Sequence, residues 1–237
     1  MNARGVLAAL AAVALGGGAG YLGYRWQVAA TGAPVLRPAG AGNPAGAAAG
    51  GNAPGATAGD AAASPKVPET LPDIRLAGLD GQPRTLRDFG HRPLIVNFWA
   101  TWCEPCRREM PLLTALRGEY RADGLEVVGI AVDFRDSVAD FQKKTPLDYP
   151  LLVGEEDGIE AARAFGMQMV LPFSVFVDER DRIIALKVGE LHRDEADAIL
   201  GAMRALRAGQ VSLADTRSRI EERLKALAEA RHAGAPG

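Results

Sequence analysis

The chain passes from a strand to a pair of cysteines in the stretch Val96-Asn97-Phe98-Trp99-Ala100-Thr101-Trp102-Cys103-Glu104-Pro105-Cys106. Strand-forming residues over 94–98 lead into the cysteine pair, and a helix is expected after the pair, over 107–120. Cys103 and Cys106 are the only cysteines of the protein. Two thiols carried from a strand to the start of a helix are an arrangement for thiol–disulfide chemistry.

The spacing of the two cysteines indicates how they would act. Cys103 would lie at a helix N-terminus, where outward-pointing N–H groups and the helix dipole stabilise the thiolate, which is the reactive form. We expect Cys103 to attack a substrate disulfide and Cys106 to resolve the mixed disulfide. A zinc site would need four ligands, and none of the three histidines lies at ligand spacing from the pair. The sequence therefore predicts a redox pair with no metal and no cofactor.

The residues beside the thiols are expected to tune them. Glu104 and Pro105 lie between the cysteines, and Pro105 suits the first turn of the helix. A carboxylate at Glu104 opposes formation of the neighbouring thiolate and so favours the disulfide form, which predicts a reductant rather than a strong oxidant. The alternative is that Glu104 only complements the helix dipole. Trp102 is expected to shield the thiols and pack against substrate, with packing in the core as its alternative.

Composition narrows the class of protein. The chain has 237 residues and a net charge of −2, so nothing indicates a nucleic-acid-binding surface. Two cysteines three positions apart cannot form a disulfide framework that staples a fold, although they can pair with each other. Such sparing use of cysteine fits an oxidising compartment.

The N-terminal part has the composition of a membrane anchor followed by a tether. The segment 5–24 has no charged residue, and about twenty uncharged residues suffice to cross a bilayer as a helix. We expect a cytoplasmic tail over 1–4, a signal-anchor over 5–24 and a disordered linker rich in Ala, Gly and Pro over 25–66. The alternative is a signal peptide cleaved after Val28-Ala29-Ala30.

Hydrophobic patterns predict an α/β domain over 67–208, with a mixed central sheet and helices on both faces. The strand–helix–strand order after residue 92 predicts a right-handed unit with parallel strands. Pro111, inside the first helix, predicts a kink there. The expected elements are a hairpin around Asp80-Gly81, a strand over 92–98, a helix over 107–120, a strand over 125–132, helices opened by capping boxes at Ser137 and Asp157, strands over 173–177 and 182–188, and a helix over 193–207.

The C-terminal extension, 209–237, is expected to hold one more helix. Ser212-Leu213-Ala214-Asp215 has the pattern of a capping box, and the helix should reach about Arg231. It could dock on the domain itself or bind a partner. Its apolar residues form a narrow stripe: Leu213, Ile220, Leu224 and Leu227.

Three features together resemble a thioredoxin fold: the motif Trp102–Cys106, Pro111 inside the helix and Leu171-Pro172 before the last hairpin. With the Asp-Gly hairpin and the membrane anchor, the stretch that ends in Cys103 is similar to the TlpA/ResA family of membrane-anchored thiol–disulfide oxidoreductases. The resemblance covers 67–208. It implies a thioredoxin fold with an added N-terminal β-hairpin, preceded by a transmembrane anchor and a disordered linker.

The resemblance also implies a substrate clamp. Pro172 would be a cis-proline that faces the cysteines. Leu171, the residue before it, would pair with an extended segment of the substrate, so that main-chain hydrogen bonds supply affinity.

Proton handling is where the sequence departs from ordinary thioredoxins. Their buried acid corresponds here to Asn97, which cannot titrate. ResA-like proteins carry an acid after the next strand, and the best match is Asp136, with Asp133 as the second candidate. Either would take the proton of Cys106 during resolution. The alternative is that Asp136 is an exposed residue ahead of a helix cap.

The function implied by the resemblance is reduction of disulfides in envelope proteins, such as apocytochrome c or copper-centre assembly proteins. A membrane thiol transporter of the DsbD or CcdA type would supply electrons. We expect a monomer, held in the inner membrane by a single span with its domain in the periplasm. The alternatives are an oxidant or isomerase that makes disulfides, and a binding module that carries Cu(I) on the two thiolates.

Overall fold

The computed structural model describes residues 67–168 and 170–234. The predicted cytoplasmic tail, signal-anchor and linker, which end at residue 66, lie outside the described residues. Among the helices of the described ranges, none has the length and apolar character needed to span a bilayer.

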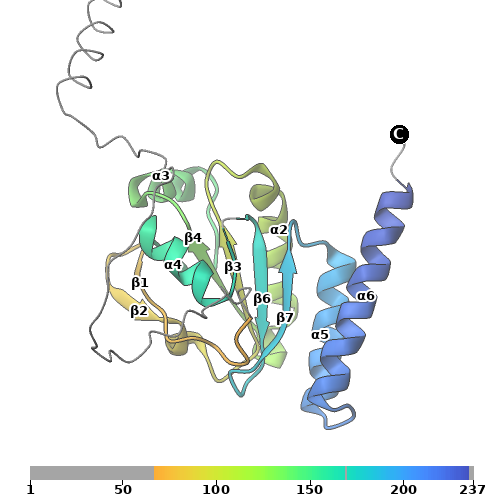
Figure 1. Ribbon diagram of the computed structural model, residues 1–237. Helices are drawn as coiled ribbons and strands as arrows, with labels where there is room; N and C mark the ends of the chain where they lie inside the picture. The colour runs from red at the N-terminus through yellow and green to blue at the C-terminus, as the bar shows by residue number, and fades with distance from the viewer. Residues whose placement is uncertain (1–66, 169, 235–237) are drawn as a thin grey trace, which may run out of the picture. The chain divides into compact units, whose positions relative to one another are not determined.

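Seven strands of the described chain form one mixed sheet, in the order β2-β1-β5-β4-β3-β6-β7 (Figure 1). The pairs β3–β4 and β4–β5 are parallel, whereas β1–β2, β1–β5, β3–β6 and β6–β7 are antiparallel. The parallel pairing predicted around the first helix is therefore confirmed. The strands are β1 (Arg75–Gly78), β2 (Pro83–Thr85), β3 (Leu94–Trp99), β4 (Glu126–Ala131), β5 (Leu151–Val153), β6 (Phe173–Val177) and β7 (Ile183–Val188).

Strand β3 lies inside the sheet, between β4 and β6, and all six of its residues are buried. Ile95 and Trp99 belong to a hydrophobic cluster on one face of the sheet, whereas Val96 and Phe98 belong to a cluster on the other. Side chains alternate between the two faces of a strand, so Asn97 lies on the face of Ile95 and Trp99. This register places an uncharged polar side chain directly under the helix that carries the cysteines.

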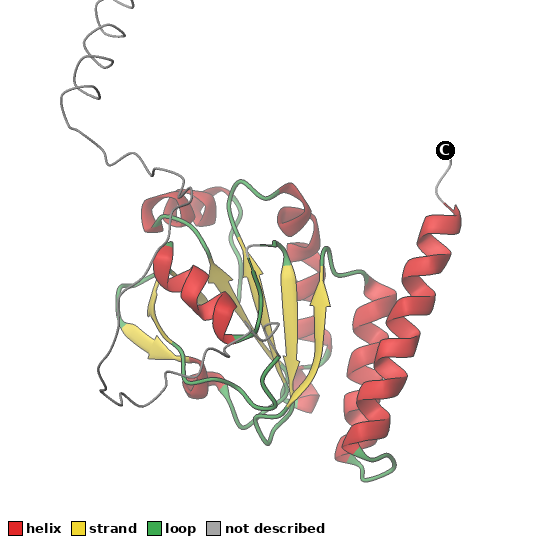
Figure 2. Ribbon diagram, viewed as in Figure 1, coloured by secondary structure: helices red, strands yellow, loops and turns green. Residues whose placement is uncertain are grey.

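Helices cover both faces of the sheet (Figures 1 and 2). The cluster on one face takes Met110 and Leu113 from the first helix and Ile199 from a helix near the C-terminus. The cluster on the other face takes Ala161 and Ala162. The helices are α2 (Glu104–Glu119), α3 (Arg135–Lys144), α4 (Glu156–Ala164), α5 (Arg193–Arg207) and α6 (Leu213–Gly234), with short 3-10 turns at Leu86–Phe89 and Arg121–Asp123.

The bounds of β6 and α5 agree with the sequence-based expectation, but three other predictions were wrong. Strand β5 was missed because its three residues are too few to form a pattern. Helix α3 begins at Arg135 without a side-chain cap, so Ser137 lies inside it and the predicted capping box does not exist. Helix α4 likewise begins at Glu156, ahead of the box expected at Asp157.

Helix α6 packs on the domain itself, which was one of the two alternatives for the C-terminal extension. Ser212 accepts a hydrogen bond on its Oγ from the N–H of Asp215 at 3.1 Å, which is one of the two bonds of the predicted capping box. Ile220 is only 3% exposed. Arg217 donates to the carbonyl of Ile183 in β7 at 2.6 Å. Figure 1 shows α6 running back alongside α5.

Candidate active site

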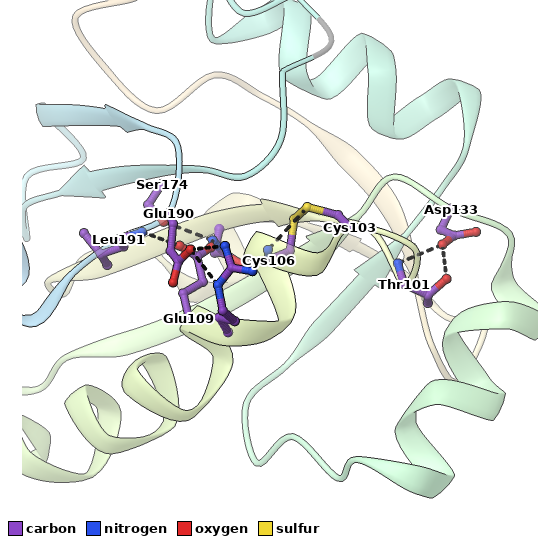
Figure 3. The surroundings of a disulfide bond; sticks show 10 residues. Thr101, Cys103, Cys106, Glu109, Asp133, Ser174, Glu190 and Leu191 are labelled. Carbon is purple, nitrogen blue, oxygen red and sulfur yellow. Dashed lines mark hydrogen bonds and ion pairs between the residues drawn. A yellow bond between two sulfur atoms is a disulfide. The ribbon is translucent and has the colours of Figure 1, made fainter. Parts of the chain in front are cut away.

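Cys103 and Cys106 form a disulfide at the start of α2 (Figure 3). Cys103 is the N-cap of this helix, and its Sγ accepts the backbone N–H of Cys106 at 3.3 Å. Pro105 lies in the first turn, where the N–H that it lacks would have no partner within the helix. The geometry that the sequence predicted for the two thiols is thus present. After reduction, the same N–H groups and helix dipole stabilise a thiolate at Cys103.

The two cysteine residues differ in exposure. Cys103 is 5% exposed, whereas Cys106 is 0% exposed, so an incoming disulfide reaches Cys103 first. Trp102, immediately before it, is 65% exposed. That exposure excludes the core-packing alternative for Trp102 and leaves its indole face available to a substrate.

The Leu171–Pro172 peptide bond is cis, as the resemblance implied. Phe173 follows directly and pairs with Phe98 near the end of β3. Pro172 therefore lies near the C-terminal end of β3, where the chain leaves the sheet and continues to the cysteines. Leu171 makes no hydrogen bond within the described part of the chain, and Val170 is 49% exposed. Open backbone groups at this edge are suited to the addition of an extended peptide.

Glu104 extends into solvent beside the thiols, with its side chain 73% exposed. Arg108, one turn later on the helix, lies 3.3 Å from it. Arg108 also forms an ion pair with Glu190 at 2.6 Å. Exposed charges of this kind are well screened by water. Glu104 can therefore exert only a weak electrostatic effect on Cys103.

A buried carboxyl group that the sequence reasoning missed lies one helical turn after Cys106. Glu109 is 1% exposed and receives two hydrogen bonds, from Asn97 Nδ2 and from the backbone N–H of Leu191, each at 2.6 Å. Burial raises its pKa to about 7, against the lowering effect of these two donors. The charge of Glu190 raises the pKa further, and that of Lys187 lowers it. Figure 3 shows Glu109 between Cys106 and the loop that carries Glu190 and Leu191.

Asn97 can satisfy either protonation state of Glu109. Its Nδ2 also lies 3.0 Å from Ser174 Oγ, whereas its Oδ1 is buried with no hydrogen-bond partner among the described residues. Rotation of the amide by half a turn would bring Oδ1 to the carboxyl group, where it can accept a hydrogen bond from the O–H of neutral Glu109. The residue that replaces the acid of ordinary thioredoxins is therefore the partner of an acid on the neighbouring helix.

The two aspartates proposed from sequence differ in burial. Asp136 is exposed in the first turn of α3. Asp133 is 6% exposed, and its Oδ2 accepts both the N–H and the hydroxyl of Thr101, at 2.9 and 2.5 Å. Asp133 thereby ties the end of β4 to the turn before the cysteines. Figure 3 shows Asp133 and Glu109 on opposite sides of the disulfide.

Comparisons with known proteins show the family of this chain. Residues 66–200, more than half of the chain, match the family described as Redoxin. The thiol-disulfide oxidoreductase ResA of Bacillus thuringiensis subsp. konkukian is 29% identical over 136 residues, which cover 57% of this chain and 77% of the relative. The thioredoxin-like protein YneN of Bacillus subtilis is 35% identical over 133 residues, which cover 54% of this chain and 75% of the relative.

A solved structure shares the fold. It belongs to a protein from Chlorobium tepidum assigned as thiol:disulfide interchange protein DsbE, and it superimposes with a TM-score of 0.53 at 23% sequence identity. The alignment covers 59% of this chain and 96% of that structure. Helix α6 begins beyond the residues that match the Redoxin family.

Proposed function

This chain belongs to the redoxin family, and we propose on that premise that it is a thiol–disulfide oxidoreductase that reduces disulfides of periplasmic client proteins. One observation carries the proposal: the disulfide lies at the start of a helix, which Cys103 caps. Cys103 is the more exposed of the two cysteines, and the buried carboxyl group of Glu109 follows Cys106 by one helical turn. This arrangement provides both a nucleophile and a proton acceptor for the second thiol.

The first step of the reaction uses the reduced protein. The thiolate of Cys103 attacks one sulfur of a client disulfide, a new S–S bond forms, and the client disulfide breaks. The other client sulfur leaves as a thiolate and takes a proton from solvent. The products are a mixed disulfide and one free client thiol.

The second step releases the client. Cys106 gives its proton to the carboxylate of Glu109, which is its neighbour at i+3 on the helix. The resulting thiolate attacks the Sγ of Cys103, and the client leaves as its second thiolate. The protein ends as the Cys103–Cys106 disulfide, and the client has gained two electrons. A pKa of about 7 suits Glu109 to this role, because at neutral pH it is available both as acceptor and as donor.

The cis-Pro loop would hold the client. The backbone of Leu171, which has no hydrogen bond among the described residues, supports the addition of an extended client segment next to Cys103. The exposed indole of Trp102 and the exposed Val170 would offer apolar surface to that segment. Because main-chain bonds carry most of this recognition, it suits several clients, such as apocytochrome c and copper-centre assembly proteins.

The direction of electron flow and the location belong to the same proposal. The exposed carboxylate of Glu104 beside Cys103 adds a small preference for the disulfide form of the protein, in the direction expected of a reductant. A membrane thiol transporter of the DsbD or CcdA type would restore the dithiol. The uncharged segment over 5–24 would hold a monomer in the inner membrane with its domain in the periplasm.

Trapping of the mixed disulfide tests the proposal. The Cys106→Ser variant, expressed in the native host, should remain covalently joined to its clients through Cys103, and mass spectrometry should identify disulfide-containing periplasmic proteins. A variant with both cysteines replaced by serine is the control and should carry no adduct. Adducts that persist in the control, or the absence of any Cys103-dependent adduct, would overturn the proposal.

The reduction potential tests the direction. Equilibration of the wild-type protein with glutathione should give a value of about −200 mV or lower, as expected for a reductant. A value near about −120 mV, in the range of strong oxidants, would make the protein an oxidant instead.

A further inference from the structure

The backbone N–H of Leu191 and that of His192 are held by two different buried glutamates. Leu191 donates to Glu109 at 2.6 Å, and His192 donates to Glu195 at 3.0 Å. The side chain of Glu195 is 2% exposed. These two N–H groups belong to consecutive peptide planes that meet at the Cα of Leu191, so a bond that holds one plane restricts the range of positions open to the other. Whatever orients Glu195 thus also orients a donor to Glu109.

The cationic partners of Glu195 come from two elements. Arg231, near the end of α6, forms an ion pair with Glu195 Oε1 and a second one with Asp194 at 3.1 Å. Lys187, on β7, lies 3.5 Å from the same Oε1 atom. A buried carboxylate is stable only when it has such partners, so the loss of one leaves the other to compensate.

We propose that Arg231 is a positioning residue for the proton acceptor Glu109, because it fixes Glu195 and through it the adjacent peptide groups of Leu191 and His192. The inference rests on the proposed function, in which Glu109 takes the proton of Cys106. It gives the C-terminal helix, which lies outside the residues matched by the Redoxin family, a role in the chemistry of the site.

The position of α6 makes this coupling possible. Arg217 holds the beginning of the helix to the carbonyl of Ile183, Ile220 is buried in its middle, and Arg231 holds its end to the first turn of α5. Figure 1 shows α6 passing the N-terminal end of α5, where the loop from β7 arrives, and projecting beyond it. The helix is thus held at its beginning by Arg217 and near its end by Arg231.

The direction of the effect follows from the groups that face Glu109. On β3, Asn97 donates to it; on the loop after β7, Leu191 donates and Glu190 repels; on β7, Lys187 attracts. Ahead of β5, burial raises the pKa of Tyr149, and the charge of Glu109 raises it further. Loss of Arg231 removes the restraint on the Leu191 N–H, which donates to Glu109. It also leaves Lys187, the cation that attracts Glu109, as the remaining cationic partner of Glu195. Both changes disfavour the carboxylate at Glu109, so it should hold its proton to a higher pH.

The test is a titration of Glu109 in the oxidised full-length protein, without any client. NMR of protein labelled with ¹³C at the glutamate carboxyl groups would follow it, with Glu109→Gln identifying the resonance. We expect Arg231→Gln to move the midpoint upward by about half a pH unit or more. Arg223→Gln is the matched control, because Arg223 is exposed on the same helix and has no hydrogen bond or ion pair within the described residues. It should leave the midpoint unchanged.

Two outcomes would overturn the inference: an unchanged midpoint in Arg231→Gln, or an equal shift in Arg223→Gln, which would reflect net charge alone. Arg231→Lys decides the matter if the Gln variant does not fold, because it keeps the charge but cannot span both Asp194 and Glu195. It should give a smaller upward shift, and an unchanged midpoint would again overturn the inference. Since no client is present, this result is independent of the trapping experiment, and either proposal can fail alone.

Discussion

Two glutamates of helix α2 lie in opposite surroundings, five positions apart. The side chain of Glu104 is 73% exposed and meets Arg108 in solvent, whereas Glu109 is 1% exposed and meets Asn97 beneath the helix. Glu104 is closer in sequence to the attacking Cys103, yet water screens its charge. Burial gives Glu109 a pKa of about 7 and thereby a useful proton affinity. The difference teaches that the side of the helix, rather than the distance along the chain, selects the carboxyl group that takes part in the chemistry.

Replacement of each glutamate by glutamine should break this comparison most clearly. Glu109→Gln should slow steady-state reduction of a peptide disulfide at about pH 7 by about 100-fold, because the proton of Cys106 has no acceptor. Glu104→Gln should change the rate by no more than about twofold, since the removed charge is exposed. Equal losses in the two variants would show that burial does not distinguish the two groups.

The pH dependence of stability should separate the wild type from Glu109→Gln. The folded protein holds the Glu109 proton with a pKa of about 7, against an ordinary value of 4.5, so the folded state binds it more tightly. This contribution to stability is complete below about pH 4.5 and is lost as the pH rises to about 7, at a cost of about 3 kcal/mol. Chemical denaturation at about pH 4 and about pH 8 measures it. Relative to the wild type, the variant should gain about 3 kcal/mol between these values, and a constant difference would contradict the buried titration.

Removal of the Asn97 amide should sharpen the comparison, because it changes the surroundings of Glu109 and leaves those of Glu104 unchanged. Asn97→Ala deletes a donor to the carboxylate, so Glu109 should protonate at a higher pH, and the free energy of unfolding should fall by about 1–3 kcal/mol. Ser174→Ala is the matched control, because Ser174 contacts Asn97 without contacting Glu109 in the hydrogen-bonded network. A titration of Glu109 should move in the first variant and remain in place in the second. The same shift in both would assign it to general loosening of the core.

The smallest effect is expected at the exposed glutamate. Glu104→Gln removes a weak obstacle to the Cys103 thiolate, so the reduction potential should rise by roughly 10–20 mV. Equilibration with glutathione at low and high salt measures this shift. It should shrink as salt screens the exposed charge. A shift of about 60 mV or more that is insensitive to salt would place Glu104 among the dominant groups instead.

Much of the fold could be predicted because its central elements have strong local patterns. The continuous apolar run of β3, the cysteine pair and the spacing of apolar residues in α5 each indicate one structure. Strand β5 has only three residues and depends on pairing with β4 and β1. The capping pattern at Ser137 was misleading because helix α3 begins at Arg135, two residues before Ser137. The local sequence does not determine this starting point.

The cysteines and the cis-proline could be predicted from the motif and the resemblance, but Glu109 could not. In the sequence it follows Arg107 and Arg108, where a charged residue suggests a solvated face. Its burial depends on Asn97, 12 residues away, and on Leu191, 82 residues away. One signal was available: Glu109 shares a helix face with Cys106, Met110 and Leu113, all of which are buried.

The central claim is that Glu109 takes the proton of Cys106 when the mixed disulfide is resolved. The most direct test is a single-turnover measurement of that step, from a preformed mixed disulfide between Cys103 and a small thiol, as a function of pH. The wild type should show an inflection near pH 7, where Glu109 titrates, and Glu109→Gln should be slower and lack it. The same inflection in both proteins would contradict the account.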